Sequence, residues 1–180
     1  MNSHNNVILI NDFINQKDFD DIIQMIDLYS YSNDYPGWKL NGFSNQEDTN
    51  KRFWFIDLID NEYFNKQIFE KIKLQISKLF DDDVILDRVY LNGSTFGQQG
   101  YFHIDDTLEN SRTLLIYCNS EWKNEWVGGT VFETLGGIQT IYPLPKRAAY
   151  FDARIPHFSQ PLSKDFDGLR VTLAYKLLLK

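Results

Sequence analysis

The sequence predicts a mostly β protein in which two N-terminal helices pack on a β-rich body, and three observations lead to this fold class. Apolar residues recur with helical spacing in two segments before residue 80. From Val84 onward, short apolar runs alternate with turn residues. The chain has 180 residues and is 43% hydrophobic, which is enough to bury a core. We therefore expect a sandwich or barrel behind the two helices.

The N-terminal region begins with an apolar strand at residues 7–10, followed by a helix. Asn15 is the expected N-cap, and Asp18 lies in the first turn. The apolar stripe of this helix consists of Phe19, Ile22, Ile23 and Ile26. These residues share one helical face, so we expect that face to pack on the rest of the protein.

A second strand and a second helix are predicted at residues 52–58 and 61–80. Residues 30–51 form a long polar connection between the two helical units. Its aromatic residues are explained equally well by a cover over the core edge and by a lid over a substrate; they are Tyr31, Tyr35, Trp38 and Phe43.

The C-terminal half is divided into short strands by turn residues. We expect these strands at residues 84–92, 100–105, 112–119, 129–134, 137–142, 147–151 and 168–179. The pair Gly128-Gly129 is explained equally well by a simple turn and by a close backbone approach.

Composition excludes several classes of protein. A formal charge of −7 and a pI of about 4.9 argue against nucleic acid as a partner, because phosphate binding needs a basic surface. The single cysteine, Cys118, rules out an internal disulfide and a cysteine-based zinc site. Neither a signal-peptide pattern nor an apolar run of about 18 residues is present. We therefore expect a cytoplasmic protein with no membrane partner; the sequence carries no signal for an oligomeric state.

The histidines suggest a metal site. Of His4, His103 and His157, the second belongs to a His-x-Asp triplet with Asp105. Residues i and i+2 of a strand point to the same face, so His103 and Asp105 would share a face. His157 would supply a third ligand from another strand. Two imidazoles and one carboxylate form an open-sided site suited to iron(II).

Arg170 lies within an apolar strand, where a charge is costly unless it is paired. One explanation is an internal salt bridge with a carboxylate. The other is a site for an anionic co-substrate, since a guanidinium binds carboxylates through two parallel hydrogen bonds.

At these residues the chain resembles the Fe(II)- and 2-oxoglutarate-dependent oxygenases, in particular their prolyl 4-hydroxylase-like branch with small bacterial and phage members. The resemblance covers roughly residues 84–177. The matching segments are Arg88–Asn92, Thr95–Gly100, His103–Asp105, Thr113–Asn119, Trp122, Trp126, Gly128–Phe132, Pro145–Arg147, Phe151-Asp152, Ile155–His157 and Arg170–Lys176.

The resemblance implies a double-stranded β-helix, a jelly-roll variant. It implies one dioxygenase domain over residues 1–180, with a helical support region and first strands at 1–80 and a catalytic core at 84–180. It makes the metal ligands His103, Asp105 and His157. It makes Arg170 the partner of the distal carboxylate of 2-oxoglutarate, supported by Tyr117, Tyr90 and Thr172.

The implied reaction is C–H hydroxylation coupled to release of succinate and CO2 from 2-oxoglutarate, with Fe(II) and O2. The resemblance also implies ascorbate as an auxiliary cofactor. A prolyl residue of a peptide or protein is the favoured substrate, with Arg112, Trp122 and Trp126 as candidate contacts. Collagen-type members use lysine where this chain has Arg170, so the chain matches the arginine subset that includes oxygen-sensing prolyl hydroxylases. DNA-repair members carry a second arginine six positions later, where this chain has Lys176.

Two other functions stay open at this point. One is a non-catalytic jelly-roll binding module, which would bind no divalent metal. The other is a cupin-type metalloenzyme that does not use an oxo acid, which would bind metal but not 2-oxoglutarate.

Overall fold

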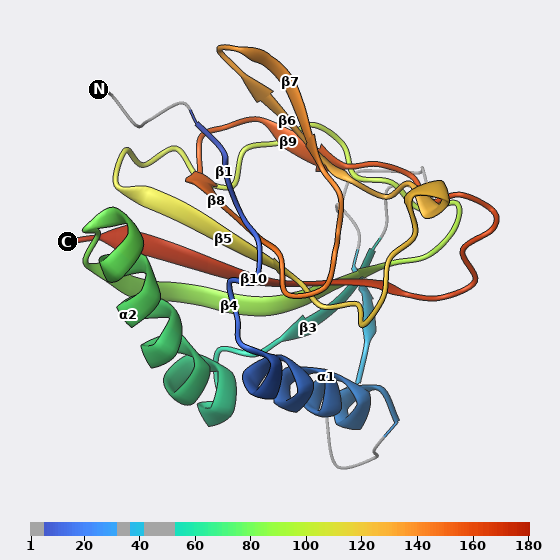
Figure 1. The fold of residues 1–180 in the computed structure, drawn as a ribbon, viewed down its shortest axis with the longest axis horizontal. Helices are drawn as coiled ribbons and strands as arrows, with labels where there is room; N and C mark the ends of the chain where they lie inside the picture. Colours follow the sequence, from blue (N-terminus) through green and yellow to red (C-terminus); the bar gives the residue numbers. More distant parts are fainter. Residues whose placement is uncertain (1–5, 32–36, 42–52) are drawn as a thin grey trace.

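Two antiparallel sheets face each other, and both helices lie on the side of the larger sheet that faces away from the smaller one (Figure 1). The computed structural model describes residues 6–31, 37–41 and 53–180. The seven-stranded sheet has the order β1 (Ile8–Ile10), β8 (Ala148–Asp152), β5 (Ser111–Tyr117), β10 (Arg170–Leu179), β4 (Val84–Ser94), β3 (Phe53–Asp57) and β2 (Lys39–Asn41). The three-stranded sheet has the order β7 (Gly137–Ile141), β6 (Thr130–Thr134) and β9 (His157–Ser159). This arrangement is the predicted jelly-roll core preceded by helices.

The first helix, α1 (Gln16–Tyr31), begins where the sequence predicts. The Asn15 side-chain oxygen accepts a hydrogen bond from the backbone N–H of Asp18 at 2.9 Å, so Asn15 caps the first turn. Phe19, Ile22 and Ile26 of the apolar stripe are buried. The cap and the stripe are both local signals, and the structure confirms both.

The second helix, predicted as one element at residues 61–80, combines two helical geometries in the structure. It starts as a π-helical segment, η3 (Tyr63–Ile68), and continues as α2 (Phe69–Phe80). It ends at Asp81, whose φ of 60° is left-handed and stops the helix. No helix among the described residues is long and apolar enough to cross a membrane.

The central strand β10 separates two environments. Its outward side chains join the large apolar core beneath the helices: Val171, Leu173, Tyr175 and Leu177. The alternate side chains face the smaller sheet and the space between the sheets: Arg170, Thr172, Ala174 and Lys176. All eight are buried, because the helices cover the outward face and the smaller sheet lies over the inward face. The positive charges of Arg170 and Lys176 therefore lie inside the protein.

The prediction of a strand at residues 100–105 is wrong. Within this segment only His103 forms a bridge, in which the His103 and His157 backbones exchange hydrogen bonds of 3.1 and 2.9 Å. A strand needs a neighbour of matching length, and the partner here is the three-residue strand β9. Neither β9 nor β2 is predicted from the sequence. Predictions that concern His4, Tyr35, Phe43 and Arg52 lie outside the described residues.

Candidate metal and co-substrate site

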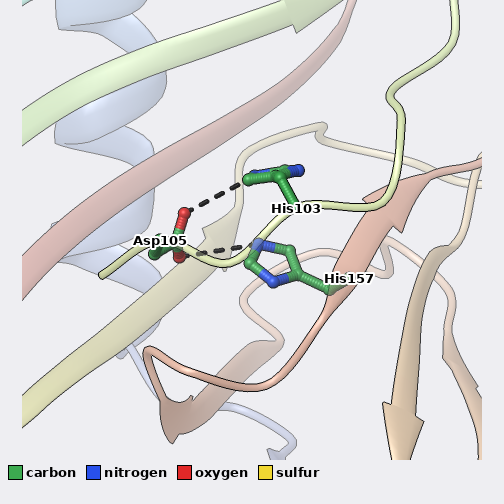
Figure 2. Close-up of side chains that lie close together, drawn as sticks. All are labelled: His103, Asp105 and His157. Carbon is green, nitrogen blue, oxygen red and sulfur yellow. Dashed lines mark ion pairs between the residues drawn. The ribbon is translucent and has the colours of Figure 1, made fainter. Parts of the chain in front are cut away.

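Three side chains from two segments converge between the sheets. His103 and Asp105 lie on the connection between β4 and β5, and His157 begins β9. Asp105 Oδ1 lies 3.5 Å from His103 Nε2, and Asp105 Oδ2 lies 3.5 Å from His157 Nε2 (Figure 2). One ligand atom from each residue lies within 4.8 Å of the others, and no other three His, Cys, Asp or Glu side chains in the described part of the chain come together in this way. The structure thus brings together the three predicted metal ligands.

Backbone carbonyl groups orient both imidazole rings. His103 Nδ1 lies 2.9 Å from the Tyr101 carbonyl oxygen, and His157 Nδ1 lies 2.9 Å from that of Ile155. A carbonyl oxygen only accepts hydrogen bonds, so each Nδ1 carries the proton and each Nε2 keeps a free lone pair. Both lone pairs face Asp105. This is the tautomer and ring orientation that a metal ligand requires.

His157 is further fixed by aromatic neighbours. Its ring stacks on Phe132 at a centroid distance of 5.6 Å and meets the edge of Phe151 at 5.0 Å. This burial lowers the pKa of His157 to about 4, although the charge of Asp105 acts in the opposite direction. His157 is therefore neutral near pH 7, as metal binding requires.

Asp105 is held ionised in a buried setting. Burial by itself would raise the pKa of Asp105, but the charge of the adjacent Lys176, which also donates a hydrogen bond, outweighs it, and the pKa lies well below the usual value. Thr113 Oγ1 donates a hydrogen bond of 2.7 Å to Asp105 Oδ2. The Lys176 ammonium forms an ion pair with the same oxygen. Two imidazoles and an ionised carboxylate make a donor set that fits iron(II).

A cavity of about 470 Å³ joins this triad to the inner face of β10. Its inner wall carries polar side chains from three strands, β4, β6 and β10: Asn92, Ser94, Thr130, Arg170, Thr172 and Lys176. Aromatic and apolar side chains also line it, among them Phe53, Phe55, Tyr90, Tyr101 and Ile104. The metal-ligand candidates and Arg170 therefore line one cavity.

Arg170 is buried without a carboxylate partner among the described residues. Its Nε donates to the Gly128 carbonyl oxygen at 2.6 Å, and Nη2 donates to Thr130 Oγ1 at 2.9 Å. Its guanidinium carbon lies 5.7 Å from the centre of the Tyr117 ring. Burial lowers the pKa of Arg170, but a guanidinium stays protonated in proteins. Of the two explanations for this arginine, the structure therefore favours a site for an anion.

Gly128 permits this approach to the arginine. Its φ is +66°, and a Cβ there would lie 2.5 Å from the Leu162 side chain and 3.4 Å from Arg170 Cδ. A larger residue would displace these neighbours. Of the two explanations for Gly128-Gly129, the close backbone approach holds at Gly128.

The three predicted supporting residues occupy different places. Tyr117 is fully buried behind the cavity wall and directs its hydroxyl to Thr130 Oγ1 at 2.9 Å, so it reaches the cavity through Thr130. Tyr90 and Thr172 line the cavity themselves. The Tyr90 ring lies 5.8 Å from the Lys176 ammonium.

Three residues of the site, Lys176, Thr113 and Thr130, have no role at the site that the sequence predicts. For Lys176 a signal is present, because alternation along the strand places it on the same face as Arg170 and Thr172. Thr113 and Thr130 carry no distinctive sequence signal. Their roles follow from hydrogen bonds to Asp105 and Arg170.

The candidate substrate contacts Arg112, Trp122 and Trp126 have other partners in the structure. Arg112 is buried and pairs with Asp152 at 3.4 Å. The two tryptophans pack on each other and on Phe166, in a separate apolar cluster. None of the three lines the cavity.

Solved structures share this fold along nearly the whole chain, whereas no protein-family model and no curated protein matches the sequence. A prolyl-4-hydroxylase from Pseudomonas putida matches with a TM-score of 0.69 and 13% identity, over 98% of this chain and 94% of that one. A prolyl hydroxylase from Trichoplax adhaerens, in complex with a peptide of the hypoxia inducible factor oxygen degradation domain, matches with a TM-score of 0.73 and 16% identity, over 97% and 84%.

A third structure matches with a TM-score of 0.74 and 9% identity, over 97% of this chain and 79% of that one. It is the epimerase SnoN in complex with Fe3+, alpha ketoglutarate and nogalamycin RO. The fold of this chain is therefore the jelly-roll fold of prolyl 4-hydroxylases and other 2-oxoglutarate- and Fe(II)-dependent oxygenases.

Proposed function

We propose that the protein is an Fe(II)- and 2-oxoglutarate-dependent dioxygenase that hydroxylates a prolyl residue of a peptide or protein. The observation that carries the proposal is a single cavity with two ends. One end is suited to a metal cation, and the other is suited to an anion. The His103–Asp105–His157 triad has the donor set for Fe(II), and Arg170 offers a buried positive charge with no carboxylate partner among the described residues. A cofactor and an anionic co-substrate thus have adjacent sites.

Each end of the cavity has a distinct task. His103, Asp105 and His157 would hold the iron, with both imidazoles already in the required tautomer. Arg170 would pair with the distal carboxylate of 2-oxoglutarate, while Thr130 and the Gly128 carbonyl fix its guanidinium. When bound, iron and 2-oxoglutarate supply the oxidising chemistry, in which O2 converts 2-oxoglutarate to succinate and CO2 and hydroxylates a C–H bond.

A polypeptide substrate is supported by the surface next to the triad. The connection that carries His103 and Asp105 exposes several large apolar side chains: Phe96, Phe102, Ile104 and Leu108. Such residues suit contacts with a peptide chain on either side of a target residue. The fold likeness to the P. putida and T. adhaerens enzymes favours proline as that residue, whereas the likeness to SnoN allows a small-molecule substrate.

The first experiment measures the co-substrate reaction. Purified protein with Fe(II), 2-oxoglutarate and ascorbate should form succinate slowly in air even without a prime substrate, and His103→Ala should not. A proline-containing peptide array, read by mass spectrometry for a gain of one oxygen, then tests the substrate.

Three outcomes would contradict the proposal in different ways. Absence of divalent-metal binding would favour a non-catalytic jelly-roll module. Metal binding without binding of 2-oxoglutarate would favour a cupin-type enzyme that uses no oxo acid. Succinate formation with no peptide modified on the array would retain the dioxygenase and remove the prolyl assignment.

A further inference from the structure

Lys176 lies inside the candidate metal site although lysine is not one of its ligands. It is on the inner face of β10, and its side chain is only 5% exposed. Its ammonium group pairs with Asp105 Oδ2, donates a 3.2 Å hydrogen bond to Thr113 Oγ1, and lies 5.8 Å from the Tyr90 ring centre. Within the described part of the chain, these contacts of the cation lead to the Asp105 carboxylate or to neutral side chains.

Two positive groups therefore compete for the Asp105 carboxylate: the Lys176 ammonium group and a metal ion bound at the triad. Asp105 is the only acidic member of the triad, and Lys176 already neutralises it within the protein. A divalent ion at the triad would share this carboxylate with an ammonium group in the same buried space. Like charges at close range repel, and burial strengthens the repulsion because water screens it poorly.

We propose that Lys176 is an internal counter-ion that neutralises Asp105 in the metal-free protein and thereby weakens the affinity of the site for divalent metal. Thr113 completes the arrangement by holding Asp105 Oδ2 beside the ammonium group. The inference rests on the proposed metal site and adds a residue that tunes it. Lys176 thus acts on the metal through Asp105. It lowers the affinity of the site for metal and stabilises the folded protein when no metal is bound.

Removal of this charge gives two opposite effects. In Lys176→Met the metal-free protein keeps a buried carboxylate without a counter-ion, so its Tm should fall by roughly 10 °C. A divalent ion then becomes the main counter-charge of Asp105. Its affinity should rise by about 5–150-fold, the usual range for coupling between two sites. A residue that merely fills space would not tighten metal binding when it is removed.

The experiment compares Mn(II) binding by calorimetry and Tm with and without EDTA. Lys176→Met should lower the Tm in EDTA, bind Mn(II) more tightly than the wild type, and recover most of its lost Tm in Mn(II). Lys176→Gln, which keeps a hydrogen-bond donor without charge, is the second variant. Its Tm in EDTA and its Mn(II) affinity should change in the same directions as in Lys176→Met, but by smaller amounts.

Lys71→Met is the matched control. Lys71 pairs with the buried Asp18 near the helices, away from the cavity, so its removal should leave Mn(II) affinity unchanged. An unchanged or weakened Mn(II) affinity in both Lys176 variants would overturn the inference while the metal site stands. Failure of the wild type to bind Mn(II) would instead overturn the metal site, and the inference with it.

Discussion

The two faces of β10 have the same length and the same burial, yet they serve different purposes. The outward face consists of Val171, Leu173, Tyr175 and Leu177, which pack into the core beneath the helices. The inward face carries Arg170, Thr172, Ala174 and Lys176. On the first face burial removes apolar area from water and stabilises the fold. On the second face burial places two charges in a cavity.

The two faces of β10 should tolerate different substitutions. An apolar core accepts changes that conserve volume, since its contacts are non-directional. The inward charges depend on particular partners: Arg170 on Gly128 and Thr130, and Lys176 on Asp105. We therefore expect inward substitutions to alter binding and outward substitutions to alter stability.

The largest effect is expected at the triad that the inward face borders. His103→Ala removes a candidate ligand, and Mn(II) affinity should fall more than about 100-fold, since even the outer partners of metal ligands contribute about 10–100-fold. Calorimetry measures this loss. Phe102→Ala is the control, because Phe102 is half exposed and packs on Phe158. Wild-type Mn(II) affinity in His103→Ala would remove this histidine from the site.

The next effect is expected at Arg170, on the inward face itself. Arg170→Ala should weaken binding of N-oxalylglycine to the Mn(II)-loaded protein by about 2–5 kcal/mol, the usual loss when one partner of a buried charge pair is truncated. The KM for 2-oxoglutarate should rise accordingly. Arg170→Lys keeps the charge but loses the two-pronged geometry, so an intermediate loss is expected. An unchanged KM in Arg170→Ala would exclude the proposed carboxylate contact.

The smallest effect on binding is expected on the outward face. Leu173 is fully buried, so Leu173→Ala should lower the free energy of unfolding by about 3 kcal/mol in urea titrations. Mn(II) affinity of the folded protein should stay at the wild-type value. Leu135→Ala is the matched control because Leu135 is 85% exposed, and its effect should be within about 0.5 kcal/mol. A large change in Mn(II) affinity in Leu173→Ala would show that the two faces are coupled.

Local patterns predicted the elements whose signals are local. The Asn15 cap and the apolar stripe of α1 lie within a few residues of each other, and both are present. The apolar run within residues 168–179 predicted β10, which the structure places at Arg170–Leu179. The prediction failed at residues 100–105, because whether an extended segment joins a sheet depends on the length of its neighbour, here the three residues of β9.

The two buried arginines show the same limit at the level of single residues. Arg112 and Arg170 both lie on strands. The sequence suggests a substrate contact for Arg112, and either an internal salt bridge or an anion site for Arg170. The fold places Asp152 beside Arg112 and no described carboxylate beside Arg170. Only this difference in partners distinguishes a structural ion pair from a candidate anion site.

The sequence by itself determined the types of residue at the site and the strand face on which they lie. Alternation puts Arg170, Thr172 and Lys176 on one face of any straight strand, and the His-x-Asp triplet brings His103 and Asp105 close together. Only the tertiary structure decided which groups these residues meet. The register that aligns Lys176 with Thr113 joins positions 63 residues apart. Charge partners across such separations are set by the pairing of strands in the sheet, which side-chain periodicity along one strand does not specify.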